Sequence, residues 1–170
     1  MDSHMTAGER NKRYKAAGLL AALVLVVGWI YYVFSPKELS NVLDFQPSEA
    51  TDYTVTEMPN AVSSKSRSLD DTPLIEMIDA LNIRYCGPSF GVRRFETGQH
   101  IYEIWFFKVN DQLEEIGNIS VFENGYIYLG ESKYEAVDQE RFDELLDFLR
   151  GTIHNRTDSP FQLFAFLWRI

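Results

Sequence analysis

The sequence is poor in the residues that build most catalytic and metal sites. It contains one cysteine, Cys86, and three histidines among 170 residues. A single cysteine excludes an intrachain disulfide framework and a cysteine-rich zinc site. The glycine-rich stretch 87–91 lacks the Gly-Lys-Ser/Thr ending of a phosphate-binding loop, and the sequence has no calcium-loop or zinc-protease motif. We therefore expect no cofactor, no metal and no small-molecule ligand.

Charge is missing from one long segment near the start of the chain. Residues 16–34 read AAGLLAALVLVVGWIYYVF and carry no charged side chain. Nineteen helical residues rise about 28 Å, close to the ~30 Å hydrocarbon core of a bilayer. Trp29, Tyr31 and Tyr32 lie near its end, where an aromatic belt meets the lipid headgroups. The segment predicts a single transmembrane helix.

Other interpretations of residues 16–34 fit less well. Helices of soluble proteins rarely run this long without a polar residue. A cleaved signal peptide needs small residues before the cut, and a cut after Ser35 would place Pro36 directly behind it. A lipoprotein needs a cysteine directly after the apolar stretch, and a type IV pilin needs a Gly-Phe-Thr-Leu-type site with an acidic residue; neither is present. We therefore expect the anchor to be retained.

The charges on the two sides of this segment differ in sign. Residues 1–15 carry four basic and two acidic side chains, whereas residues 35–170 carry 12 basic and 23 acidic ones. The positive-inside rule predicts a cytoplasmic N-terminus, with residues 35–170 outside the cytoplasm at the cell membrane. An acidic body is a poor binder of nucleic acid. Residues 1–4 are typical of a cloning scar, so we expect the natural chain to start at Met5.

Three regions follow the predicted span. Residues 35–50 are rich in polar and turn-forming residues and predict a linker. Residues 51–151 show strand-like and helix-like patterns and predict one extracytoplasmic domain. Residues 152–170 form a tail that ends in the almost wholly apolar run 161–170. Three roles stay open for this tail: a last strand in the sheet, a segment at the membrane interface, or a segment that docks on a partner.

Two helices are expected in the body of the chain. The first begins at Pro73, which suits the first helical position, and ends near residues 82–85. The second begins after the capping residue Asp138 and ends at Gly151, because glycine favours the position just past a helix. Both carry a single apolar stripe, so each is expected to pack one side against a sheet.

The strand-like runs predict an antiparallel sheet. Residues 52–57 alternate like an edge strand, whereas residues 100–109 are apolar on both faces, as in a central strand. Asn124 and Gly125 between two strand-like runs predict a hairpin with a type I′ turn. The chain is therefore predicted to be α+β: one N-terminal transmembrane helix, then an antiparallel sheet of four to five strands with two helices packed on one face.

The run NISVFENGYIYLGESKYEAVDQERFDELLDFL, within about residues 116–149, combines such a hairpin with a capped amphipathic helix. It resembles the small extracytoplasmic α+β domains of unknown function found on membrane-anchored or lipoprotein chains of Gram-positive bacteria. Such domains are often taken as binding or inhibitory modules. The resemblance therefore implies a binding role rather than catalysis.

Three groups of residues are candidate contacts or reactive groups. Arginine clusters favour carboxylates, and exposed apolar residues favour protein partners, so the candidate partner contacts are Arg84, Tyr85, Arg93, Arg94, Phe161, Phe164 and Trp168. Small residues in the span permit close helix packing, which makes Gly18, Ala22 and Gly28 candidates for it. A nucleophilic cysteine needs a base within reach, so Cys86 is a candidate together with His100, its nearest histidine in sequence. Glu103 is a second candidate, because a charged residue inside an apolar strand needs a partner of opposite charge or a functional role.

These features favour a membrane-tethered protein-interaction domain without catalytic activity. Its expected partners are the lipid bilayer through residues 16–34 and an envelope or membrane protein. One alternative is an accessory subunit of a membrane complex that makes its contacts through the transmembrane helix. A second alternative is an envelope enzyme that uses Cys86 or Glu103.

Overall fold

A computed structural model describes residues 7–70, 72–89, 99–110 and 112–154 of the chain. The chain divides into two compact units, Met1–Ser35 and Pro36–Ile170. Each unit is described by itself.

The first unit contains a single helix, α1 (Ala7–Phe34). Its part Tyr14–Phe34 has 21 residues and a mean hydropathy of 2.2, and none of its most apolar window is buried within the protein. This helix is long and apolar enough to cross a membrane. It begins before residue 16, where the charge-free segment starts, because the preceding residues also favour helix.

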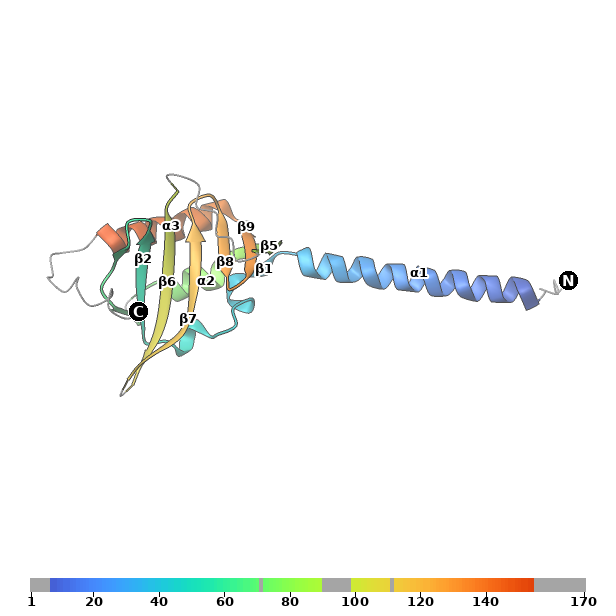
Figure 1. Cartoon of the computed structure of the whole chain (residues 1–170), viewed down its shortest axis with the longest axis horizontal. Helices are drawn as coiled ribbons and strands as arrows, with labels where there is room; N and C mark the ends of the chain where they lie inside the picture. The colour runs from blue at the N-terminus through green and yellow to red at the C-terminus, as the bar shows by residue number, and fades with distance from the viewer. Residues whose placement is uncertain (1–6, 71, 90–98, 111, 155–170) are drawn as a thin grey trace. The chain divides into compact units, whose positions relative to one another are not determined.

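The second unit is built on one antiparallel sheet of nine strands in the described residues (Figure 1). The order along the sheet is β1-β5-β9-β8-β7-β6-β2-β3, and β4 also pairs with β2. The strands are β1 (Lys37–Glu38), β2 (Asp52–Met58), β3 (Val62–Ser63), β4 (Arg67–Ser68), β5 (Asn82–Pro88), β6 (Ile101–Val109), β7 (Leu113–Phe122), β8 (Tyr126–Leu129) and β9 (Ser132–Ala136).

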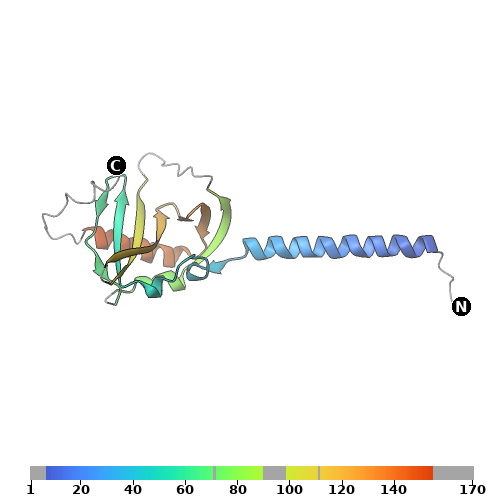
Figure 2. The same cartoon turned by 60° about the horizontal axis from the view of Figure 1, so that its bottom comes forward.

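Two α-helices, α2 (Leu74–Ala80) and α3 (Gln139–His154), pack on one face of this sheet (Figures 1 and 2). Two short 3-10 helices, η1 (Leu39–Asn41) and η2 (Pro47–Glu49), precede β2. The side chains of both α-helices and of η1 belong to a single apolar core. Helices and strands that each present one apolar face reach a stable arrangement by burying those faces against each other.

Strict alternation in β2 and β6 decides which face is covered. Tyr53 and Val55 of β2 are fully buried and stand opposite Phe106 and Ile104 of β6, which are buried as well. Ile104 in turn stands opposite the buried Ile119 of β7. Because side chains alternate between faces along a strand, these residues form one apolar layer on the helix-covered face.

The α+β class and the antiparallel sheet with two helices on one face are confirmed, but the predicted count of four to five strands is wrong. Strands β1, β3 and β4 have two residues each, too few for an alternation to show in the sequence. The run 82–88, expected as the end of a helix and a loop, forms strand β5. Strand β2 is not an edge strand, because β3 and β4 pair with its outer side.

The segments on both sides of the predicted domain also differ from expectation. Residues 35–50 are not a free linker: β1 pairs with β5, and Leu39 and Pro47 are buried. Helix α3 continues through Gly151 to His154, since Thr152 and Ile153 are buried and their burial outweighs the helical cost of a glycine. The tail therefore starts later than residue 152, and residues 155–170 lie outside the described part of the chain.

The hairpin at Asn124 and Gly125 is confirmed between β7 and β8, but its turn is not type I′. Of these two residues only Gly125 has a positive φ, at 89°, whereas a type I′ turn needs positive φ at both. The backbone nitrogen of Gly125 donates to the carbonyl of Phe122 at 3.1 Å. A tight turn with one left-handed glycine therefore joins the strands.

A close packing contact on the covered face gives a test of this fold. A side-chain carbon added at Gly117 would overlap the ring of Phe45, which also packs on Phe106 with ring centroids 5.4 Å apart. We expect Gly117→Ala to lower the free energy of unfolding by about 2 kcal/mol through overpacking. Urea unfolding of the chain in a non-ionic detergent measures this loss.

The double variant Gly117→Ala, Phe45→Ala is the control. Removing the ring removes the overlap, so its cost should be smaller than the sum of the two single costs by about 1 kcal/mol or more. Strict additivity would show that Phe45 does not lie over Gly117.

Candidate functional site

A cluster of polar side chains lies where β6 begins, at one end of the sheet. His100 Nδ1 lies 2.6 Å from Glu57 Oε1. Arg150 Nη2 donates to Glu123 Oε1 at 2.8 Å, and Arg150 is also hydrogen-bonded to the hydroxyl of Tyr102. These five residues come from β2, from the start of β6 and the residue before it, from the residue after β7, and from α3. We call them the end cluster.

The sheet register brings the end cluster together. Glu57 continues the buried alternation of β2 after Tyr53 and Val55, so its side chain is directed to the covered face, where the residue is 8% exposed. It stands opposite Tyr102 of β6. The backbone nitrogen of Glu123 donates to the carbonyl of His100 at 3.3 Å, which holds the end of β7 beside the start of β6.

Through its hydrogen bonds to Glu123 and Tyr102, Arg150 holds α3 against this end of the sheet. Besides Glu123 and Tyr102 it binds Asp147 on its own helix, with Nη1 donating to Oδ1 at 3.1 Å. The hydrogen bond to Glu123, followed by the one to Tyr102, raises the pKa of Arg150 above its usual value. A guanidinium that is engaged by two carboxylates and a phenol has its donors largely occupied, so its main effect is to position α3.

Glu57 and His100 form the chemically most suggestive pair in the cluster. The Glu57 side chain is only 11% exposed, whereas the imidazole of His100 is 40% exposed. A carboxylate that holds one ring nitrogen of a histidine leaves the other nitrogen available for proton transfer. In the described residues no serine, threonine or cysteine side chain is hydrogen-bonded to His100.

Little in the sequence indicates the end cluster. Glu57, Glu123 and Arg150 come from segments far apart in the chain, and each looks like an ordinary surface charge in its own segment. One signal was present: Glu57 falls on the apolar side of the alternation with Tyr53 and Val55. A carboxylate on a buried face needs a partner, which in this fold is His100.

Arg84 and Tyr85, two candidate partner contacts, lie on β5, and their side chains point to opposite faces. Arg84 is exposed, whereas the ring of Tyr85 contacts that of Tyr134 with centroids 5.6 Å apart. Adjacent residues of a strand alternate between faces, so they do not form one basic-aromatic patch. The other candidate partner contacts, Arg93, Arg94, Phe161, Phe164 and Trp168, lie outside the described residues.

Cys86 and His100 are not brought together. Strands β9, β8 and β7 lie between β5, which carries Cys86, and β6, which follows His100. Four interstrand spacings amount to roughly 15 to 20 Å. Burial, followed by the charge of Glu135, raises the pKa of the Cys86 thiol, so the thiolate is disfavoured.

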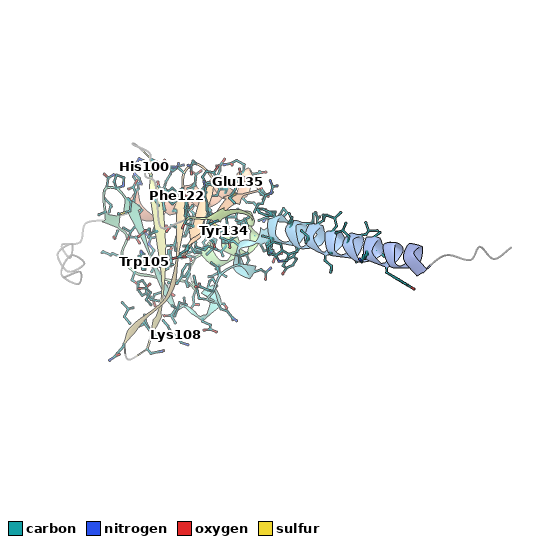
Figure 3. All side chains as sticks on the ribbon, turned by 45° about the vertical axis from the view of Figure 1, so that its right-hand side comes forward. His100, Trp105, Lys108, Phe122, Tyr134 and Glu135 are labelled. Carbon is teal, nitrogen blue, oxygen red and sulfur yellow. The ribbon has the colours of Figure 1, made fainter. Side chains whose placement is uncertain are left out.

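Glu103 lies on the face of the sheet that the two α-helices do not cover, and we call this surface the open face. Its directly opposite neighbours are Thr56 on β2 and Ser120 on β7. Trp105, which Figure 3 labels, and Phe107 follow it at every second position of β6, so by strand alternation they lie on the same side. Glu103 therefore sits at the edge of an aromatic stripe.

Further aromatic side chains lie on the same face, on β7 and β8, and Asn118 and Ser120 of β7 separate them from Trp105. The rings of Phe122 and Tyr128 are 4.6 Å apart. Lys133 Nζ lies 3.4 Å from the ring centroid of Tyr126. Trp105, Phe107, Tyr126 and Tyr128 are only partly buried. The stripe continues to Val109 and Leu113, which stand opposite each other near the tip of the β6–β7 hairpin and are 48% and 64% exposed.

The three candidate helix-packing residues of the anchor are open to their surroundings. A side-chain carbon at Gly18 or Gly28 would meet nothing within 4 Å, and Ala22 is exposed.

Comparison with known protein families, curated proteins and solved structures found no match to this chain. The open face, the end cluster and α1 are therefore the features from which a function can be proposed.

Tyr102 gives a test of the end cluster through its pKa. Burial, opposed by the hydrogen bond to Arg150 and assisted by Glu123 and Glu57, raises the pKa of Tyr102 above its ordinary value of 10. The folded state therefore holds the phenol proton more tightly than the unfolded state. The resulting stability is present below pH 10 and is lost as the pH rises through the folded-state pKa.

We expect Tyr102→Phe to lower the free energy of unfolding at pH 8 by about 1 to 2 kcal/mol, because it leaves Arg150 without one partner. The variant should also lose part of the decline in stability between about pH 9 and pH 11. Urea unfolding across this pH range measures both effects. Tyr134, whose pKa burial also raises, is the matched control, and Tyr134→Phe should leave the bonds of Arg150 intact. An alkaline decline unchanged by Tyr102→Phe would contradict the assignment.

Proposed function

We propose that this chain is a membrane-tethered protein-binding subunit without catalytic activity, and that its open face carries the interface. One observation supports this most strongly: α2 and α3 cover one face of the sheet, while the other carries partly buried aromatic side chains, Trp105 and Phe107 on β6 and Tyr126 and Tyr128 on β8. Tryptophan, tyrosine, phenylalanine and arginine are the residues that protein interfaces favour. The stripe has this composition, with Arg84 on β5 at its margin.

The proposal places the domain outside the cytoplasm. Basic residues precede α1 and acidic residues predominate after it, which is the charge pattern of a cytoplasmic N-terminus. The acidic body would be repelled by anionic headgroups, so a tether would hold it near the membrane without binding it to the lipid surface. A partner is then expected among envelope or membrane proteins.

A second candidate role is that of an accessory subunit whose contacts are made by α1 itself. The observation in its favour is the open space around Gly18 and Gly28, together with the small Ala22 between them. Small residues let helix backbones approach closely in a membrane. The two roles differ in where the contact with the partner lies, so contact mapping separates them.

The single cysteine provides a test of orientation. Cys86 is exposed, so a membrane-impermeant maleimide should label it in intact cells without permeabilisation. Because the pKa of the thiol is raised, labelling is expected to be slow at neutral pH and faster at pH 8.5. The gel shift of the labelled chain measures the reaction, and Cys86→Ser is the control for specificity. Labelling that occurs only after permeabilisation would place the domain in the cytoplasm.

Contact mapping in intact membranes tests the interface. A photo-crosslinking phenylalanine analogue at position 105 should join the chain to a specific protein, because Trp105 lies in the aromatic stripe. The same analogue at position 144 is the control, because Glu144 is an exposed residue of α3 on the helix-covered side. Denaturing gels and peptide mass spectrometry identify the adducts.

The two candidate roles give different patterns in this experiment. Adducts from position 105 and not from position 144 support the open face as the interface. Adducts only from an analogue at position 22 of the anchor favour the accessory-subunit role. Equal adducts from positions 105 and 144 would contradict a defined interface on the sheet.

A further inference from the structure

The end of α3 lies close to the margin of the open face. Arg67 Nη2 of β4 donates to the carbonyl of Thr152 at 3.3 Å, so the last turn of α3 is held beside β4. Strand β4 pairs with β2, and β2 pairs with β6, which carries Trp105. The chain thus leaves α3 at the side of the sheet where the aromatic stripe of β6 is only two strands away.

Sixteen residues of sequence, 155–170, follow the described part of α3. An extended chain spans ~3.3 Å per residue, so the six residues 155–160 can reach about 20 Å. Adjacent strands lie ~4.8 Å apart and a packed sheet layer is ~10 Å thick, so this reach is enough to pass around β4 and β2 to the open face. The ten residues 161–170 can then extend over about 33 Å.

The two surfaces match in chemistry. The run 161–170 reads FQLFAFLWRI and contains four aromatic residues and a single charged one, Arg169. Leaving such a run in water is unfavourable by about 25 cal/mol for each Å² of apolar surface. The open face offers Trp105, Phe107 and Tyr128, which are only partly buried. Contact between residues 161–170 and the open face would therefore remove apolar surface on both from water.

We propose that residues 161–170 bind across the open face of their own chain, over Trp105, Phe107 and Tyr128. The segment then covers the surface that the proposed function assigns to a partner, and the partner has to displace it. The docking itself stands on the reach of the chain and the apolar match. Only the competition with a partner rests on the proposed function.

Trp105 can report on this docking in the purified full-length chain. The sequence has three tryptophans, so Trp29→Phe with Trp168→Phe leaves Trp105 as the only one and keeps an aromatic ring at position 168. Iodide quenches the fluorescence of exposed tryptophans only. In this background we expect weak quenching, and a severalfold larger quenching constant when Phe164→Glu and Phe166→Glu are added.

Val137→Glu in the same background is the matched control. Val137 is 42% exposed, between β9 and α3, so it brings a new carboxylate without changing the tail. Quenching should stay as in the parent. Equal quenching constants with and without the charged tail would overturn the docking, as would an increase of the same size for Val137→Glu.

A crosslink identifies the segment that lies on the stripe. The photo-crosslinking analogue at position 105 of the purified chain should form an internal link to a peptide within residues 161–170, with a yield independent of protein concentration. Links between two copies would assign the face to a second chain and overturn the proposal. Links to detergent alone would overturn it too.

The crosslink in the purified chain tests the docking of the tail, and the contact mapping in membranes tests the proposed interface, so the two proposals can be contradicted independently. An internal link in the purified chain without a protein adduct in membranes would support the docking and contradict the proposed interface. A protein adduct in membranes without an internal link would support the interface and overturn the docking.

Discussion

The burial of one apolar layer between the sheet and two helices determines the rest of this structure. Tyr53, Val55, Ile104, Phe106 and Ile119 form that layer on the sheet side, and α2 and α3 cover it. Because strand side chains alternate, burying these residues directs the intervening ones to the opposite face. The open face is therefore a direct consequence of the core, and its aromatic residues are available for other contacts.

At the end of the sheet where β6 begins, the helix-covered face carries charged side chains in place of apolar ones. Glu57 continues the buried side of β2, and His100 binds it, while Arg150 joins α3 to Glu123 and Tyr102. A buried carboxylate without a partner is costly, so these bonds help to fix the end of the sheet relative to the helix. The end cluster positions α3 against the sheet, and binding is proposed from the open face and from α1.

Several parts of the fold could be predicted because their physical signals are local. The charge-free run of α1, the alternation in β2 and β6, the glycine turn after β7 and the capping Asp138 of α3 depend on near neighbours in sequence. The two-residue strands β1, β3 and β4 could not be predicted, since they form only where β5 and β2 offer hydrogen bonds. Strand β5 was missed for a related reason: its partner β9 is far along the chain.

The sequence by itself determined a helix long and apolar enough to span a membrane and an α+β body with antiparallel strands, because hydropathy and periodicity act over short stretches. Tertiary structure alone decided which charges meet. It placed His100 against Glu57 and not near Cys86, and it separated the side chains of Arg84 and Tyr85 onto opposite faces. Strand order and register set these distances, and they depend on the simultaneous packing of segments far apart in the chain.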